Sequence, residues 1–107
     1  MKYVITENQK EKIESLINNF IDEELSGLYT EQYYDFITLR SHEFDEDVEE
    51  WGEIVLEYDK DDGKLYINQD VIDKLQSLFG LSDYNLHLRI KKWFEKEFGV
   101  DIKYTKS

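Results

Sequence analysis

Apolar residues recur every three or four positions in three stretches of the chain, and this spacing predicts three helices. The first helix begins after a capping box, Thr6 to Gln9, in which the two side chains bond to each other's backbone. It ends near Ser26-Gly27, where glycine can take the left-handed conformation. Its apolar stripe consists of Ile13, Leu16, Ile17, Phe20, Ile21 and Leu25.

Two further helices are predicted near the end of the chain. Asp70 is placed to cap a helix over Val71–Phe79 that Gly80 ends. Ser82 is placed to cap a longer helix that reaches Phe98 and ends at Gly99. The inward residues are Val71, Ile72, Leu75, Leu78 and Phe79 in the first of these helices, and Leu86, Ile90, Trp93, Phe94 and Phe98 in the second.

Between the helices, alternating and β-branched residues predict strands. The aromatic and β-branched segment 33–40 is predicted as one strand. Residues 54–58 and 64–68 are predicted as a hairpin whose turn uses a positive φ at Gly63. Short strands are expected at 1–5 and 100–104. The buried face of the hairpin is predicted to carry Ile54, Leu56, Tyr58, Leu65 and Ile67.

No proline, flexible linker or repeat interrupts the chain, so residues 1–107 are predicted to form a single domain. The order of elements predicts an α+β fold. We expect a small antiparallel sheet of three to four strands, with three helices packed on one face.

The formal net charge of −12 narrows the class of partner. Aromatic residues make up 15% of the chain, so the charge belongs to a folded body rather than to a disordered tail. A surface this negative repels nucleic acid and anionic membranes and attracts proteins that bind them. The absence of cysteine and of any long apolar run leads us to expect a cytoplasmic protein with no membrane contact.

Seven of the eleven residues from Glu43 to Glu53 are acidic, and we expect this segment to be a loop because like charges oppose pairing. Three interpretations stay open. In the first, the carboxylates imitate the charge spacing of DNA and occupy a nucleic-acid-binding cleft. In the second, they coordinate Ca²⁺ or Mg²⁺. In the third, they only keep the protein in solution. The predicted partner-binding residues are Glu43, Phe44, Asp45, Glu46, Asp47, Glu49, Glu50, Trp51 and Glu53.

No motif for catalysis, a metal or a cofactor accompanies this segment. Residues 59–63 resemble a calcium loop, but their glycine falls at position 5 rather than position 6. His42 and His87 lack the spacing of zinc ligands, and no nucleophile elbow is present. We therefore predict no catalytic residues, no metal site and no cofactor.

The end of the chain has the opposite charge. Residues 86–107 carry six basic and three acidic side chains. Lys91, Lys92 and Lys96 either cover the solvent face of the last helix or pair with the acidic segment of another copy.

Three short segments resemble a group of small, uncharacterised proteins encoded by tailed bacteriophages, many of them marine. They are residues 1–9 (MKYVITENQ), residues 57–66 and residues 79–100. The resemblance covers most of the chain except the acidic segment. It implies a phage or prophage origin and supplies no activity and no site residues.

These observations favour a non-enzymatic phage-type protein that binds another protein, acting as a DNA-mimic-like inhibitor of a host nucleic-acid enzyme or defence complex. The first alternative is a virion or assembly accessory protein that self-associates through the basic last helix and the acidic segment. The second is a small enzyme that uses paired carboxylates or a metal.

Overall fold

The computed structural model describes residues 7–107. The strand expected at 1–5 and the capping box at Thr6 lie outside this range. The described residues form, in chain order, α1 (Glu7–Ser26), β1 (Tyr29–Gln32), β2 (Phe36–Arg40), β3 (Ile54–Asp59), β4 (Lys64–Ile67), α2 (Gln69–Phe79), α3 (Asp83–Phe98) and β5 (Tyr104–Lys106).

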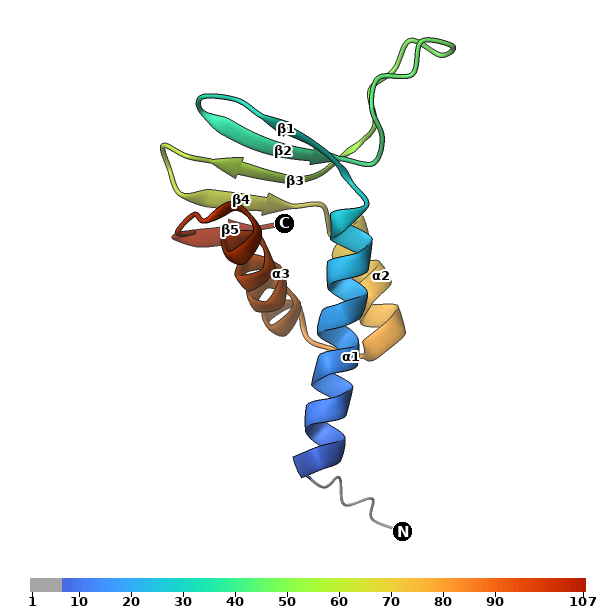
Figure 1. The fold of residues 1–107 in the computed structure, drawn as a ribbon, viewed down its shortest axis with the longest axis vertical. Coiled ribbons are helices and arrows are strands. Elements are labelled where there is room, and N and C mark those ends of the chain that lie inside the picture. Colours follow the sequence, from blue (N-terminus) through green and yellow to red (C-terminus); the bar gives the residue numbers. More distant parts are fainter. Residues whose placement is uncertain (1–6) are drawn as a thin grey trace.

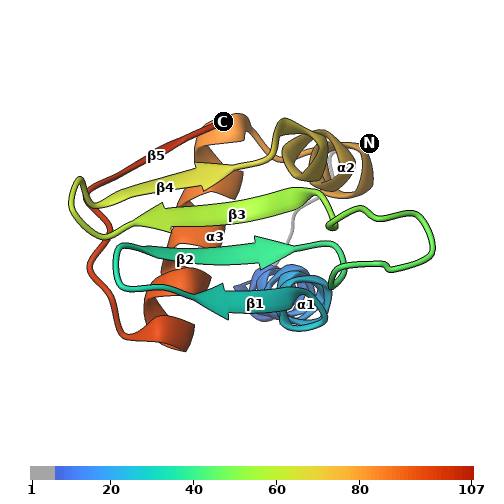
Figure 2. The same ribbon diagram turned by 90° about the horizontal axis from the view of Figure 1, so that it is seen from above.

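The strands form one sheet in the order β1-β2-β3-β4-β5. The first three pairs are antiparallel, and β5 lies parallel to β4 at the edge. All three helices lie on one side of the sheet, and no element within residues 7–107 covers the other side (Figures 1 and 2). The α+β prediction is confirmed, with more strands in the sheet than expected.

The core lies between the sheet and the helices. Leu39, Leu56, Leu65 and Ile67 point from the sheet into this layer and are at most 1% exposed. Phe94 of α3 is fully buried among them, with its ring centroid 5.7 Å from that of Tyr58 and 4.5 Å from that of Phe98. The remaining buried apolar residues are Ile17, Ile21, Leu25, Ile37, Ile72, Leu75, Leu86, Ile90 and Ile102.

The strand predicted over residues 33–40 covers only Phe36–Arg40, and β1, which precedes it, is not among the predicted strands. Residues 33–35 form the turn between β1 and β2, closed by a 2.7 Å hydrogen bond from the Tyr33 N–H to the Phe36 carbonyl. The strand expected at 100–104 begins later, because Ile102 is buried in the core and pairing with β4 starts at Tyr104.

A β-bulge corrects the prediction for Ile54. Leu39 pairs with Leu56, but Arg40, the next residue, pairs with Ile54, so Val55 has no opposite residue. The extra residue reverses the alternation at the start of β3. Val55 therefore packs against the core, and Ile54 lies on the uncovered face.

Most helix ends follow the predicted capping residues. The Ser82 side chain accepts from the Asn85 N–H, and Gly80 and Gly99 end α2 and α3 at φ 64°. Two predictions are wrong. Asn68, rather than Asp70, caps α2, because its side chain accepts from the Asp70 N–H at 2.9 Å. Gly27 has no positive φ, since α1 ends in a tight turn from the Leu28 N–H to the Leu25 carbonyl.

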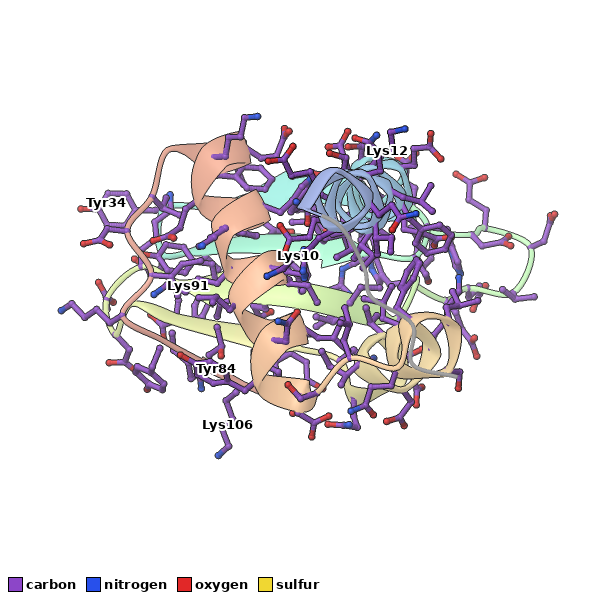
Figure 3. The ribbon with its side chains drawn as sticks, turned by 90° about the horizontal axis from the view of Figure 1, so that it is seen from below. Lys10, Lys12, Tyr34, Tyr84, Lys91 and Lys106 are labelled. Carbon is purple, nitrogen blue, oxygen red and sulfur yellow. The ribbon has the colours of Figure 1, made fainter. Side chains whose placement is uncertain are left out.

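Parts of the predicted apolar faces stay outside the core. The first half of α1 extends past the other helices (Figure 1), so Ile13 and Leu16 are 46% and 64% exposed. Leu78 of α2 is also exposed. Figure 3 shows the helical layer from below, with Lys10 and Lys12 on α1 and Lys91 on α3.

Tyr58 makes stability sensitive to alkaline pH. Burial raises the pKa of its phenol, and the negative charges of Asp101, Asp59 and Glu95 raise it further. The phenol donates to the Asp101 carbonyl at 3.2 Å. Because the folded-state pKa lies above the unfolded one, the stabilisation is complete below about pH 10 and is lost as pH rises through the folded-state pKa.

We expect Tyr58→Phe to lower the free energy of unfolding by about 0.5–1.5 kcal/mol at neutral pH, since the phenol hydrogen bond is lost. The difference between the two proteins should shrink above about pH 10. Urea denaturation from pH 7 to pH 11 measures this, and a constant difference across that range would contradict the role given to the phenol.

Candidate functional site

The acidic loop, residues 41–53, connects β2 to β3 and rises on the uncovered side of the sheet (Figure 1). Hydrogen bonds close it at two levels. At its base, the Ser41 N–H donates to the Glu53 carbonyl at 2.9 Å, and the Glu53 N–H donates to Ser41 Oγ at 2.9 Å. Nearer the tip, Asp45 and Glu50 exchange backbone bonds of 2.8 and 3.2 Å.

The prediction of a loop is confirmed, since residues 41–53 contain no helix or strand and pair only at an isolated bridge between Asp45 and Glu50. The backbone groups pair, while the Asp45 carboxylate accepts from the Asp47 N–H at 2.9 Å and so stabilises the turn. Glu49 completes the turn with a φ of 55°. These contacts give the charges a defined arrangement.

Arg40, the last residue of β2, joins the loop to the sheet. Its Nε donates to Glu31 Oε1 at 2.8 Å, and its Nη1 donates to the Gly52 carbonyl at 3.1 Å. The guanidinium carbon lies 5.4 Å from the centre of the Trp51 ring. The Arg40 and Glu31 side chains are only 23% and 11% exposed, so this ion pair is less screened than a surface pair.

Aromatic rings continue from this arginine along the loop. The Trp51 ring centroid is 6.5 Å from that of Tyr29 and 5.3 Å from that of Phe44. Trp51 and Phe44 nevertheless remain 49% and 40% exposed, and Val48 at the tip is 60% exposed. The loop thus presents apolar contact area beside its carboxylates.

The predicted site residues lie together on this loop. Phe44 and Trp51 are in contact, and the Glu53 carboxylate accepts from Asn68 Nδ2 at 2.9 Å. All of the other predicted residues are exposed. The ion pairs found within residues 7–107 are Arg40–Glu31 and Lys74–Glu24, so none involves a carboxylate of the acidic loop.

The residues that hold the loop are absent from the predicted site. Arg40, Glu31 and Tyr29 lie on one face of the neighbouring strands β1 and β2. In the sequence they are marked only by the alternation of side chains between the two faces of a strand. This alternation can be recognised only once residues 29–40 are divided into two strands.

The uncovered face of the sheet has three cross-strand rows, because residues opposite each other share a face. They are Phe36–Asp59–Lys64–Tyr104, Glu31–Thr38–Glu57–Tyr66–Lys106 and Tyr29–Arg40–Ile54. A hollow lies over the middle strands. It is lined by Phe36, Glu53, Ile54, Glu57, Asp59, Lys64, Tyr66 and Asn68.

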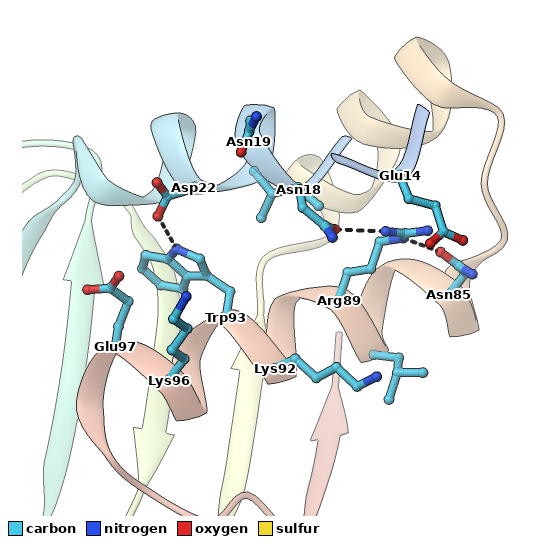
Figure 4. Close-up of a pocket in the computed structure, with 12 residues that line it drawn as sticks. Glu14, Asn18, Asn19, Asp22, Asn85, Arg89, Lys92, Trp93, Lys96 and Glu97 are labelled. Atoms are coloured by element: carbon cyan, nitrogen blue, oxygen red, sulfur yellow. Dashed lines mark hydrogen bonds between the residues drawn. The ribbon is translucent and has the colours of Figure 1, made fainter. Parts of the chain in front are cut away.

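A second hollow separates α1 from α3, but contacts within the chain use its central polar groups (Figure 4). Arg89 donates to Asn18 at 2.7 Å and to Asn85 at 2.6 Å. The Trp93 indole donates to Asp22 at 2.9 Å. The bonds to Asn18 and Asp22 join α3 to α1, so we assign this hollow a structural role.

The described part of the chain offers neither a metal site nor a membrane-spanning helix. No three histidine or carboxylate side chains there come together to hold a metal ion. None of the helices within residues 7–107 is both long and apolar enough to span a membrane. Comparison with protein-family models, curated proteins and solved structures gave no match.

Gly52 is required at the base of the loop. A Cβ at this position would lie 2.3 Å from the His42 backbone nitrogen and 2.4 Å from its carbonyl oxygen. We expect Gly52→Ala to displace the backbone and to lower the free energy of unfolding by about 1–3 kcal/mol, the usual cost of overpacking. Chemical denaturation, with amide exchange of Asp45 and Glu50, measures the effect.

The matched control is Gly27→Ala. A Cβ at Gly27 meets its nearest atom at 3.6 Å and needs no positive φ. This change should alter the free energy of unfolding by less than about 0.5 kcal/mol. Equal effects of the two substitutions would show that the close approach at Gly52 has no special cost.

Proposed function

We propose that this protein is a non-enzymatic binding module whose acidic loop docks on a basic surface of another protein. The observation that carries the proposal is an ordered, projecting loop that combines exposed aromatic rings with carboxylates lacking ion-pair partners within residues 7–107. Phe44 and Trp51 supply the contact area that typically dominates interface energetics.

The loop is suited to binding because it is already folded. Ordering a flexible segment on binding costs about 0.5–1.5 kcal/mol for each side chain immobilised, and a preformed loop avoids part of that cost. Its charges act differently from its rings. Exposed charges mainly speed association with an oppositely charged partner, whereas buried aromatic contacts slow dissociation.

The partner class follows from the charge. Proteins that bind nucleic acid present clustered Lys and Arg to phosphates, and a dense set of fixed carboxylates competes for the same groups. We therefore propose a nucleic-acid-binding enzyme or defence complex as the target, in the manner of a DNA mimic. The resemblance to short phage proteins implies that this target is in the cytoplasm of a bacterial host.

Affinity capture from bacterial lysate tests the proposal. We expect the tagged protein to retain a nucleic-acid-binding protein that is released by rising salt and by duplex DNA. Changing Glu43, Glu46, Glu49 and Glu50 to Gln should remove this retention. Each exposed ion pair contributes about 0.2–1 kcal/mol, so the loss amounts to about 1–4 kcal/mol of binding free energy. Asp45 is kept because its carboxylate stabilises the turn.

The matched control changes four exposed carboxylates away from the loop, by Glu11→Gln, Glu23→Gln, Glu97→Gln and Asp61→Asn. It changes the net charge by the same amount as the loop variant does, and it should still retain the partner in the capture experiment. Unchanged retention by the loop variant would contradict the proposal. Recovery of only the protein itself would instead support self-association through the basic side of α3.

The variant Phe44→Ala tests the contribution of the aromatic contact to binding separately from that of the charges. With the captured partner in hand, we expect this variant to bind more weakly by at least about 1 kcal/mol. The rate of dissociation should rise, while the salt dependence stays as in the unchanged protein. Surface plasmon resonance at several salt concentrations measures both, and a loss confined to the association rate would contradict a contact role for Phe44.

A further inference from the structure

The uncovered face of the sheet already holds one arginine between an aromatic ring and a carboxylate. The guanidinium of Arg40 lies 5.4 Å from the centre of the Trp51 ring and bonds to Glu31 at 2.8 Å. This arrangement suits arginine, whose planar cation stacks on a ring while its edge bonds to a carboxylate. It shows which chemistry this face can accommodate.

The hollow on the same face presents these components a second time. Phe36 and Tyr66 line it and are 37% and 38% exposed. Glu57 lies beside Tyr66 across the strands and one row away from Phe36. One oxygen of Glu57 accepts from the Thr38 hydroxyl at 3.3 Å, and Oε1 makes no hydrogen bond within residues 7–107.

The chain has no arginine of its own to place there. Its two arginines are Arg40 and Arg89. Arg89 is bonded to Asn18 and Asn85 on the helical side. An arginine in this hollow must therefore come from another molecule.

We propose that the hollow over β2, β3 and β4 binds an arginine side chain of the partner protein, with Glu57 as the carboxylate and Phe36 and Tyr66 as the flanking rings. Charge complementarity supports this occupant, since Glu53 and Asp59 also line the hollow. Asp59 mainly stabilises the neighbouring turn, where its Oδ1 accepts from the Asp61 N–H at 3.0 Å.

Lys64 also lines the hollow and opposes a cationic ligand. It is opposite Asp59 in the sheet but makes no ion pair within 4.0 Å with any residue of the described range. The net charge of the lining residues remains negative, with three carboxylates and one lysine. Lys64 therefore gives a variant that should gain affinity, which a purely structural role would not predict.

The inference rests on the proposed function for the nature of the partner, a basic protein. Glu53 belongs both to the base of the acidic loop and to the hollow, so the two surfaces are continuous. A basic partner attracted by the acidic loop would therefore meet the hollow as well.

The test is a titration of the ¹⁵N-labelled full chain with the blocked peptide acetyl-Gly-Arg-Gly-amide. Matched peptides carry lysine or citrulline, the neutral analogue of arginine, in its place. We expect shifts at the amides of Phe36, Glu57 and Tyr66, with arginine binding most tightly and citrulline most weakly. Glu57→Gln should weaken arginine binding about tenfold, and Lys64→Gln should strengthen it about twofold.

The loop variant, in which Glu43, Glu46, Glu49 and Glu50 are changed to Gln, separates this inference from the proposed function. It removes charges from the acidic loop but keeps the hollow intact. It should bind the arginine peptide within about twofold of the unchanged protein. Shifts confined to residues 43–50, equal affinity for arginine and citrulline, or no binding would overturn the inference and leave the capture experiment unaffected. If Glu57→Gln proves unstable, Tyr66→Leu should also weaken arginine binding.

Discussion

The candidate site depends on the contacts of the Arg40 guanidinium. It bonds to Glu31 of β1 and to the carbonyl of Gly52, and it lies against the ring of Trp51. A charge-assisted hydrogen bond in a half-buried place contributes more than an exposed ion pair. Through these contacts, one side chain connects two strands to a loop whose carboxylates repel one another. Without it, the acidic loop would keep its own hydrogen bonds, the bond from Asn68 to Glu53 and the ring contacts of Trp51 with Tyr29 and Phe44, but it would lose its charged link to β1 and β2.

The two faces of the sheet have different roles. One face buries Leu56, Leu65 and Ile67 under three helices and supplies stability. Helices that cover a single face leave the other to solvent, as antiparallel sheets permit. Here that free face carries rings and both signs of charge, and the acidic loop rises beside it (Figure 1). The proposed binding surface is thus a consequence of the two-layer architecture, since none of the described helices lies over this face (Figures 1 and 2).

Local patterns predict the helices well, because capping residues such as Ser82 and Gly99 satisfy backbone groups within a few positions. The acidic segment and its aromatic residues can also be read directly from the order of residues in the sequence. The rest depends on distant contacts. β1 has little apolar signal in Tyr29–Gln32, and it becomes a strand only by pairing with β2. The face occupied by Ile54 depends on a bulge at the base of the acidic loop, and Arg40 acquires its role only after β2 and the loop are in place.

The central claim is that the acidic loop is a rigid structure attached to the sheet, rather than a solvated segment that keeps the protein in solution. The most direct measurement is the ¹⁵N relaxation of the backbone amides of residues 41–53, compared with those of β3. We predict order parameters of about 0.85 through Asp45, Glu50 and Trp51, as in the strands. Values below about 0.6 across the loop would contradict the claim and would leave its charges without a fixed arrangement.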